Sequence, residues 1–375
     1  MLTNPSPPQR REVAGFLLSL AFAGLAAVRD VYFGGLFQRV NPLGVALIAF
    51  GLCTLGFLPT ALARDRGGLA ALVRRPARLL WINATTALAW LSFFFALRTI
   101  EPALVQILFY GIGPLSVRWV DRLVPGSLQT TLTPVERWLH LGLLSALAVT
   151  GAVGLSGLSG FGSQSVAVAA VGIALAVGGG VSISISTLLC RTLNDSGVRP
   201  ATLFALRFPG AVGLAAVFGL ASPAPLLSGI TPGALGTVTL ACLLLIVLPN
   251  YVNQMGVALA SPVTVRAVLA VGPVLVFVLQ LFDGRLSPSP ATLGACVLYG
   301  VCAVAAAVAR RHAIGAMVGR PGTQDASRSG SVLSLLAWRA RPSSSCGISI
   351  PLSSRRCGPG PPGAADPWRP STGKS

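Results

Sequence analysis

Long apolar runs, separated by short polar segments, make up most of the chain. A hydrocarbon core about 30 Å thick requires about 20 apolar residues in a helix that rises about 1.5 Å per residue, and ten runs of that kind fit the sequence. We therefore predict ten transmembrane helices. They cover residues 13–37, 42–63, 79–97, 102–120, 138–158, 165–189, 200–221, 235–260, 263–282 and 291–309.

The ten predicted helices divide into two halves of five. After a short N-terminal segment, residues 1–12, the first half covers 13–158, a Gly/Ser-containing linker covers 159–164, and the second half covers 165–311. The strings "ALRTIEPALVQILFYGIGPLSV" and "ALASPVTVRAVLAVGPVLVF" share a helix end, a proline-containing turn and a Gly-Pro pair. A repeat with an odd number of spans inserts with opposite orientation. We predict an all-α integral membrane fold of two inverted five-helix repeats, a common plan among secondary transporters.

Arginine placement predicts the orientation, because cytoplasmic loops retain basic residues. On the ten-helix pattern, one side receives only Arg39, Arg98 and Arg285. We therefore predict a bacterial inner-membrane protein with both the N-terminus and the C-terminus in the cytoplasm. The cytoplasmic side receives Arg10, Arg11, Arg64, Arg66, Arg74, Arg75, Arg78, Arg118, Arg122, Arg137, Arg191, Arg199, Arg310 and Arg311.

The composition excludes a soluble globular protein. Hydrophobic residues make up 53% of the chain and charged residues only 10%, against about 25% charged in soluble domains. The formal net charge of +18 does not indicate nucleic-acid binding, because the arginines lie between apolar runs and form no basic stripe. The Gly, Pro, Ser and Arg content of residues 312–375 predicts a disordered basic tail. The cysteines and histidines lack the spacing of metal ligands, so we expect no metal and no other cofactor.

The whole pattern resembles the EamA-type members of the drug/metabolite transporter superfamily over residues 13–311. The resemblance lies in "NATTALAWLSFFFALRTIEPALVQILFYGIGP", its weaker counterpart "YVNQMGVALASPVTVRAVLAVGP", and "LFDGRLSPSPATLGACVLYGVCAV" leading into the tenth helix. It implies alternating access through a cavity lined by helices 1 to 4 and 6 to 9. It also implies small-metabolite substrates, frequent coupling to protons, and helices 5 and 10 that are peripheral and available for a homodimer.

Ionisable residues inside an apolar span cost about 3 kcal/mol to insert, so each is a candidate functional residue. Arg29 and Asp30 lie late in the first predicted helix. Asp30 is the candidate proton carrier, since a desolvated carboxylate holds its proton more readily; the alternative is that the helix ends near Val28 and the pair is solvated. Arg207 and Arg266 follow the starts of the seventh and ninth helices. If both face a cavity, they favour an anionic or carboxylate-bearing substrate, and otherwise they reach the headgroups.

The eighth predicted helix carries a polar face. Asn250, Asn253 and Gln254 are spaced by three and four residues, which places them on one side of a helix. They could form a binding wall or hydrogen-bond to a neighbouring helix. The counterparts in the first half are Asn83, Trp90, Gln106 and Tyr110. Because proline removes a backbone donor, we predict helix breaks at Pro114, Pro249 and Pro273.

These features predict a secondary transporter that moves a small metabolite, by export or exchange. A non-transporting scaffold or a lipid-interacting membrane protein is the alternative. An intramembrane enzyme is disfavoured, because His140 and His312 are the only histidines and both lie at helix ends. A cavity with a polar lining would favour transport, and a dry bundle would count against it.

Overall fold

The computed structural model describes residues 7–123, 134–161, 165–260 and 262–318. The contacts divide the chain into the units Met1–Gly319 and Arg320–Ser375, and the second unit, which holds most of the predicted tail, lies outside the described residues. All regular structure in the described ranges is helical. The elements are α1 (Pro7–Leu36), α2 (Pro42–Arg64), α3 (Arg66–Val73), α4 (Pro76–Thr99), α5 (Pro102–Leu123), α6 (Pro134–Leu155), α7 (Val166–Asp195), α8 (Pro200–Leu206), α9 (Pro209–Ala221), α10 (Pro232–Cys242), the π-helix η1 (Leu243–Val247), α11 (Leu248–Leu259), α12 (Pro262–Leu269), α13 (Gly272–Gln280) and α14 (Pro290–Val318).

Eight helical stretches of the described chain are long and apolar enough to cross a membrane. They lie at eight of the ten predicted positions, and the fourth and ninth positions hold shorter apolar helices, Pro102–Gly113 and Ala267–Gln280. Large apolar side chains face outward: Trp138, Leu220 and Phe282 are 74%, 84% and 83% exposed. Extensive apolar surface of this kind is typical of contact with lipid. The chain therefore has the helices of an all-α, multi-pass membrane protein.

Prolines and small polar residues set the helix starts. Proline occupies the first turn of most of the described helices, where its missing N–H costs no helical hydrogen bond. Asn41 caps α2 by accepting a hydrogen bond from the backbone N–H of Leu43 at 3.0 Å. Ser165 caps α7 in the same way through Val168. Because these signals are local, the predicted starts lie close to the observed ones.

Three predicted spans of the second half depart from a single regular α-helix. The seventh consists of α8 and α9, separated at Arg207 and Phe208, because Pro209 has no backbone N–H to donate to the preceding turn. The eighth is helical from Pro232 to Leu259, so the chain is not broken at Pro249 as predicted; the helix instead widens into the π-helix η1, which ends at Val247. The ninth is divided between α12 and α13, next to Gly272 and Pro273, where a break was predicted.

Contrary to the prediction, the helix is not broken at Pro114. α5 runs continuously from Pro102 to Leu123. A proline removes one backbone hydrogen bond, and the turns on either side keep theirs. Ser116 adds a polar contact in this turn by donating from its Oγ to the Gly113 carbonyl oxygen at 3.0 Å. The two Gly-Pro pairs therefore have different local structures in the two halves.

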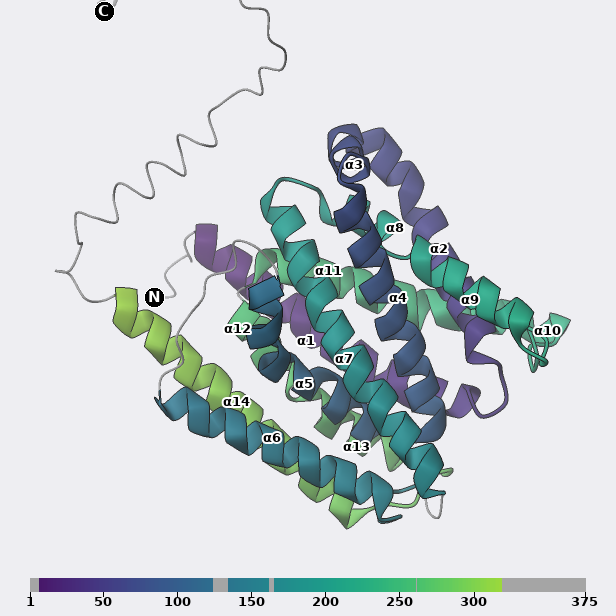
Figure 1. Ribbon diagram of the computed structural model, residues 1–375, viewed down its shortest axis with the longest axis vertical. Coiled ribbons are helices and arrows are strands. Elements are labelled where there is room, and N and C mark those ends of the chain that lie inside the picture. The colour runs from purple at the N-terminus through teal and green to yellow at the C-terminus, as the bar shows by residue number, and fades with distance from the viewer. Residues whose placement is uncertain (1–6, 124–133, 162–164, 261, 319–375) are drawn as a thin grey trace, which may run out of the picture. The chain divides into compact units, whose positions relative to one another are not determined.

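The helices of the two predicted halves pack into one another. α1 packs against α11, α12 and α13, whereas α7 packs against α4 and α5. α2 contacts α8 and α9, and α6 contacts α14; Figure 1 shows α6 and α14 side by side along one flank. Gly180 allows the close approach of α7 to α5, since a Cβ there would lie 2.3 Å from the Phe109 carbonyl oxygen.

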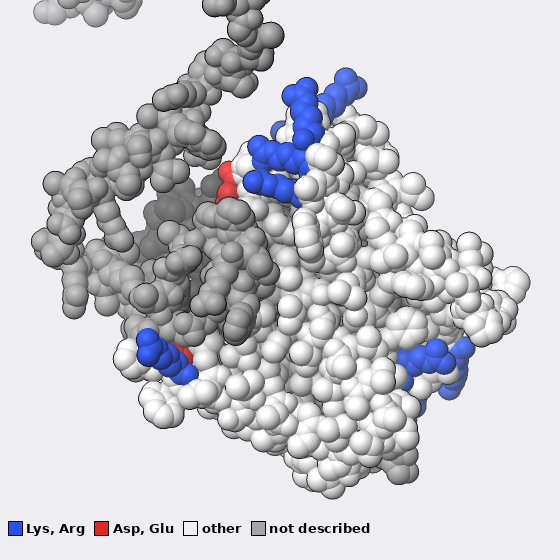
Figure 2. All heavy atoms as spheres, viewed as in Figure 1, with Lys and Arg blue, Asp and Glu red and all other residues white. Residues whose placement is uncertain are grey.

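An aromatic core joins the two halves. The ring of Phe50 in α2 stacks on Phe208 with centroids 5.0 Å apart, and on Phe94 in α4 at 5.7 Å. Such pairs stabilise a core beyond the area they bury. On the surface, Figure 2 shows basic residues gathered at the end of the molecule that carries α3, beside a wide area without charge. The exposed arginines around α3 are Arg64, Arg66, Arg74, Arg75 and Arg78.

Candidate functional site

A cavity lies between helices of both predicted halves. The cavity has a volume of about 150 Å³. α1, α4 and α5 line it from the first half, and α7, the α8–α9 break, α11, α12 and α14 from the second. Six of the eleven residues proposed from the sequence line this cavity. They are Trp90, Tyr110, Arg207, Asn250, Asn253 and Gln254.

Arg207 lines the cavity from the break between α8 and α9, and it is only 8% exposed. Its Nη1 donates to Oε1 of Gln254 at 3.0 Å, and its Nη2 donates to Oγ of Ser186 at 3.4 Å. Its guanidinium carbon lies 5.2 Å from the centroid of the Phe208 ring. Within the described part of the chain, Nε has no hydrogen-bond partner and no carboxylate pairs with the guanidinium. A side chain buried in this way does not reach the headgroups.

The polar face of α11 points into the cavity. Asn250, Asn253 and Gln254 all line it, as their spacing along a helix predicts. Asn250 donates from Nδ2 to the Ile246 carbonyl oxygen at 2.7 Å, so it supports the backbone of η1 next to the site. Tyr251, the neighbour between them, packs its ring 4.7 Å from Phe57 on another face. The helix therefore separates a polar lining from an aromatic packing surface.

A second polar face, on α7, was missed in the sequence. Ser184, Thr187 and Arg191 line the cavity, at spacings of three and four residues. That spacing marks one helical face, as on α11, and was the signal available. Ser184 and Thr187 donate their hydroxyl hydrogens to carbonyl oxygens one turn earlier. Arg191 is 38% exposed and lies 4.0 Å from Asp195, so it is the more solvated of the two cavity arginines.

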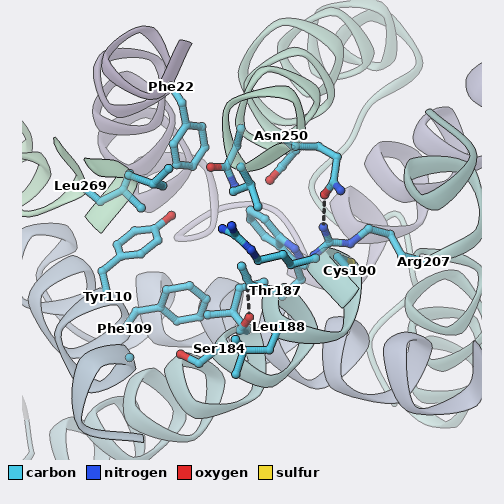
Figure 3. A pocket seen from close by; sticks show the side chains of 18 of the residues that line it. Phe22, Phe109, Tyr110, Ser184, Thr187, Leu188, Cys190, Arg207, Asn250 and Leu269 are labelled. Carbon is cyan, nitrogen blue, oxygen red and sulfur yellow. Dashed lines mark hydrogen bonds between the residues drawn. The ribbon is translucent and has the colours of Figure 1, made fainter. Parts of the chain in front are cut away.

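The other side of the cavity is apolar and aromatic. Phe22 of α1, Phe109 and Tyr110 of α5, and Leu269 of α12 contribute to it. In Figure 3 these side chains lie across the cavity from Arg207. The site therefore combines a cationic end with an apolar end.

Arg29 and Asp30 form a buried ion pair behind the cavity wall. Nε of Arg29 lies 2.6 Å from Oδ1 of Asp30, and both residues are 0% exposed. The Arg29 guanidinium carbon lies 5.1 Å from the ring centroids of Trp90 and Phe93. Both Nη atoms of Arg29 and Oδ2 of Asp30 lack a hydrogen-bond partner among the described residues. Because α1 continues past Val28 to its end at residue 36, the alternative of a solvated pair does not hold.

Two further predicted residues, Asn83 and Gln106, are not part of the described cavity lining. Asn83 bridges the α8–α9 break: its Nδ2 donates to the Leu206 carbonyl oxygen and its Oδ1 accepts from the Gly210 N–H, both at 2.8 Å. Gln106 is buried beside Gly272, and its Oε1 has no hydrogen-bond partner in the described ranges. Arg266 belongs to α12, but its side chain lies outside the described part of the structure.

Asp65 links the corner between α2 and α3 to the start of α8. Its carboxylate accepts hydrogen bonds from Thr202 Oγ1 at 2.6 Å and from the backbone N–H groups of Arg199 and Gly68 at 3.1 and 3.0 Å. Partial burial raises the pKa of Asp65, but these hydrogen bonds outweigh it and hold the pKa below its ordinary value. The ionised carboxylate therefore stabilises this contact between the halves.

Glu101, in the turn between α4 and α5, makes a comparable link. Its Oε2 accepts from the Gly160 N–H and from Thr292 Oγ1, both at 2.8 Å. Burial raises the pKa of Glu101 above its ordinary value, and the hydrogen bonds offset this only in part. Arg98, near the end of α4, is exposed and forms no salt bridge with Glu101 in the described structure.

No cluster of three or more His, Cys, Asp or Glu residues that could hold a metal occurs in the described ranges. No protein-family model matches the chain, and no curated protein matches it. A solved structure described as "Crystal structure of protein" is similar, with a TM-score of 0.54, over 80% of this chain and 99% of that chain. The sequence identity is 21%, so this similarity concerns the fold alone.

Proposed function

We propose that this chain is a secondary transporter that moves a small metabolite through the central cavity by alternating access. The position of the cavity carries the proposal: it lies between the two halves, and its polar lining comes from helices long and apolar enough to span a membrane. Ionisable and amide side chains inside a membrane-spanning segment are costly to insert, and they mark substrate pathways in membrane proteins. A scaffold gains nothing from lining an internal cavity with such side chains.

The helix packing supports an inverted repeat. A two-fold symmetry that exchanges the two predicted halves makes α1 equivalent to α7, and α4 and α5 equivalent to α11, α12 and α13. The packing of α1 on α11 to α13 then becomes the packing of α7 on α4 and α5, which is also observed. The contacts of α2 with α8 and α9, and of α6 with α14, are unchanged by the exchange. A two-fold relation of this kind occurs in many transporters, and it agrees with the resemblance to EamA-type members.

The proposal includes an orientation and an assembly. The arginines around α3 would face the cytoplasm of a bacterial cell, together with both termini, and Arg285 would face the opposite side. The flank formed by α6 and α14 exposes Leu141, Leu144, Val297 and Val301. This flank would provide the contact of a homodimer.

Counterflow in proteoliposomes tests the transport function. Liposomes that contain the purified protein would be loaded with each member of a metabolite library, and uptake of the same labelled compound would be measured. Liposomes without the protein are the control. We expect saturable exchange for at least one chemical class. A thermal unfolding measurement would first establish that the protein is folded. If folded protein then shows no exchange across a library of amino acids, amines, nucleosides and organic acids, the proposal is contradicted.

A further inference from the structure

On the basis of the proposed transport function, we infer that the cavity selects an anion: a small carboxylate that carries an apolar or aromatic body. Arg207 is the receptor for the carboxylate. Three features of the cavity favour such a ligand: the positive charge of its lining, the unpaired donors of Arg207 and Gln254, and the apolar wall opposite.

The described lining carries positive charge without compensation inside the cavity. It contains Arg191 and Arg207 and no Asp or Glu. Arg191 has Asp195 nearby at 4.0 Å, whereas Arg207 has no carboxylate partner among the described residues. Burying an unpaired cation is strongly unfavourable, so a bound anion would relieve that cost.

The polar atoms of Arg207 and Gln254 that have no partner in the described structure are hydrogen-bond donors. Nε of Arg207 and Nε2 of Gln254 are buried and have no hydrogen-bond partner within the described chain. The bond from Arg207 Nη1 to Oε1 of Gln254 fixes the amide, because the occupied oxygen leaves the NH₂ group for a ligand. These two donors, one in the guanidinium and one in the Gln254 amide, match the two oxygens of a carboxylate.

The wall opposite Arg207 selects the part of the ligand that is not the carboxylate. Phe22, Phe109, Tyr110 and Leu269 present rings and an aliphatic chain across from Arg207 (Figure 3). Such a wall buries an apolar or aromatic body and offers few donors for a second anionic group. A phosphate dianion would need more donors than this single end provides. A monocarboxylate with an apolar body therefore fits both ends.

Binding by matched ligands tests the inference without requiring transport. The thermal unfolding temperature of the detergent-solubilised protein would be measured with 3-phenylpropionate, with its neutral amide, with 3-phenylpropylamine and with inorganic phosphate. We expect the carboxylate to bind at least about ten-fold more tightly than the amide, which corresponds to about 1.4 kcal/mol. Equal effects of acid and amide, including no effect of either, would overturn the inference, as would preference for the amine or for phosphate.

Variants then locate the anion. Arg207→Gln should remove the preference for the acid over the amide, and Arg207→Lys should retain part of it, because the charge remains but the planar fork is lost. Arg98→Gln, which removes an exposed arginine away from the cavity lining, is the matched control and should keep the full preference. An acid preference that survives in a folded Arg207→Gln protein would show that another group binds the carboxylate.

The outcomes separate this inference from the proposed function. Counterflow of a neutral or cationic compound, unaffected by Arg207→Gln, would leave a transporter but overturn the anion site. Acid-selective binding that depends on Arg207, without counterflow of any carboxylate, would support the site and contradict transport.

Discussion

Arg207 donates a hydrogen bond to Gln254 across the cavity wall, from the break between α8 and α9 to the polar face of α11. The two residues lie 47 positions apart in the sequence and are both buried. The bond fixes the side-chain amide and leaves the guanidinium charge uncompensated, because an amide is neutral.

Gln254→Glu should disable the site by supplying the missing anion internally. A carboxylate at this position would pair with Arg207 in a nearly isosteric geometry, so we expect binding of 3-phenylpropionate to weaken at least about ten-fold without loss of stability. Gln254→Met, which is neutral, should weaken binding less, because it removes orientation but not charge. Calorimetry and thermal unfolding would measure both effects. Stronger carboxylate binding by the Glu variant would contradict the role of Arg207.

The Arg29–Asp30 pair should behave as a single buried unit. Arg29→Met or Asp30→Asn alone removes one partner of the pair and should destabilise the protein by about 3 kcal/mol or more, whereas Arg29→Met with Asp30→Asn should recover much of that loss. Unfolding in detergent of the wild type, both single variants and the double variant completes the cycle. Additive losses would show that the two side chains are not coupled.

Asp30 is also the proposed proton carrier, and the same Asp30→Asn variant tests that role separately. Its Oδ2 has no hydrogen-bond partner in the described residues, so it is available to accept a proton. We expect the variant to keep counterflow of an identified substrate but to lose uptake driven by a pH gradient. Intact pH-driven uptake would show that the proton is carried elsewhere.

The link made by Asp65 should depend on pH. Hydrogen bonds hold the folded-state pKa of Asp65 below its unfolded value of about 3.9. Its contribution to stability is therefore complete above that unfolded value and is lost as the pH falls through the lower, folded-state pKa. Asp65→Asn should make thermal stability less sensitive to pH in this acidic range. The exposed Asp195→Asn is the control, and an unchanged pH profile in Asp65→Asn would exclude the link.

The sequence predicted the helices better than the site, for physical reasons. Hydropathy and proline at the first turn act locally, so the starts at Pro42, Pro102 and Pro200 could be read directly. The interruption at Phe208 was missed because the apolar run continues through Pro209. The missed face with Ser184 has the same spacing as the predicted face of α11, but serines bond to their own helix, so composition alone gives them little weight.

The roles of the polar residues depended on tertiary structure. Asn83 and Asn250 look alike in the sequence, yet Asn83 bridges a helix break and Asn250 lines the cavity. Whether an arginine in a helix reaches the headgroups or stays buried depends on the packing around it, as Arg207 shows. Long-range partners such as Gln254 are not encoded in local spacing.

Accessibility of the cavity from both sides of the membrane tests the central claim most directly, and it requires no known substrate. A single cysteine would be introduced as Ser184→Cys in a background in which the seven native cysteines are replaced by serine. Arg98→Cys and Arg66→Cys mark the two sides. A membrane-impermeant thiol reagent applied to right-side-out and inside-out vesicles should label position 184 from both sides and each marker from one. Labelling of position 184 from only one side, or from neither, would contradict transport by alternating access.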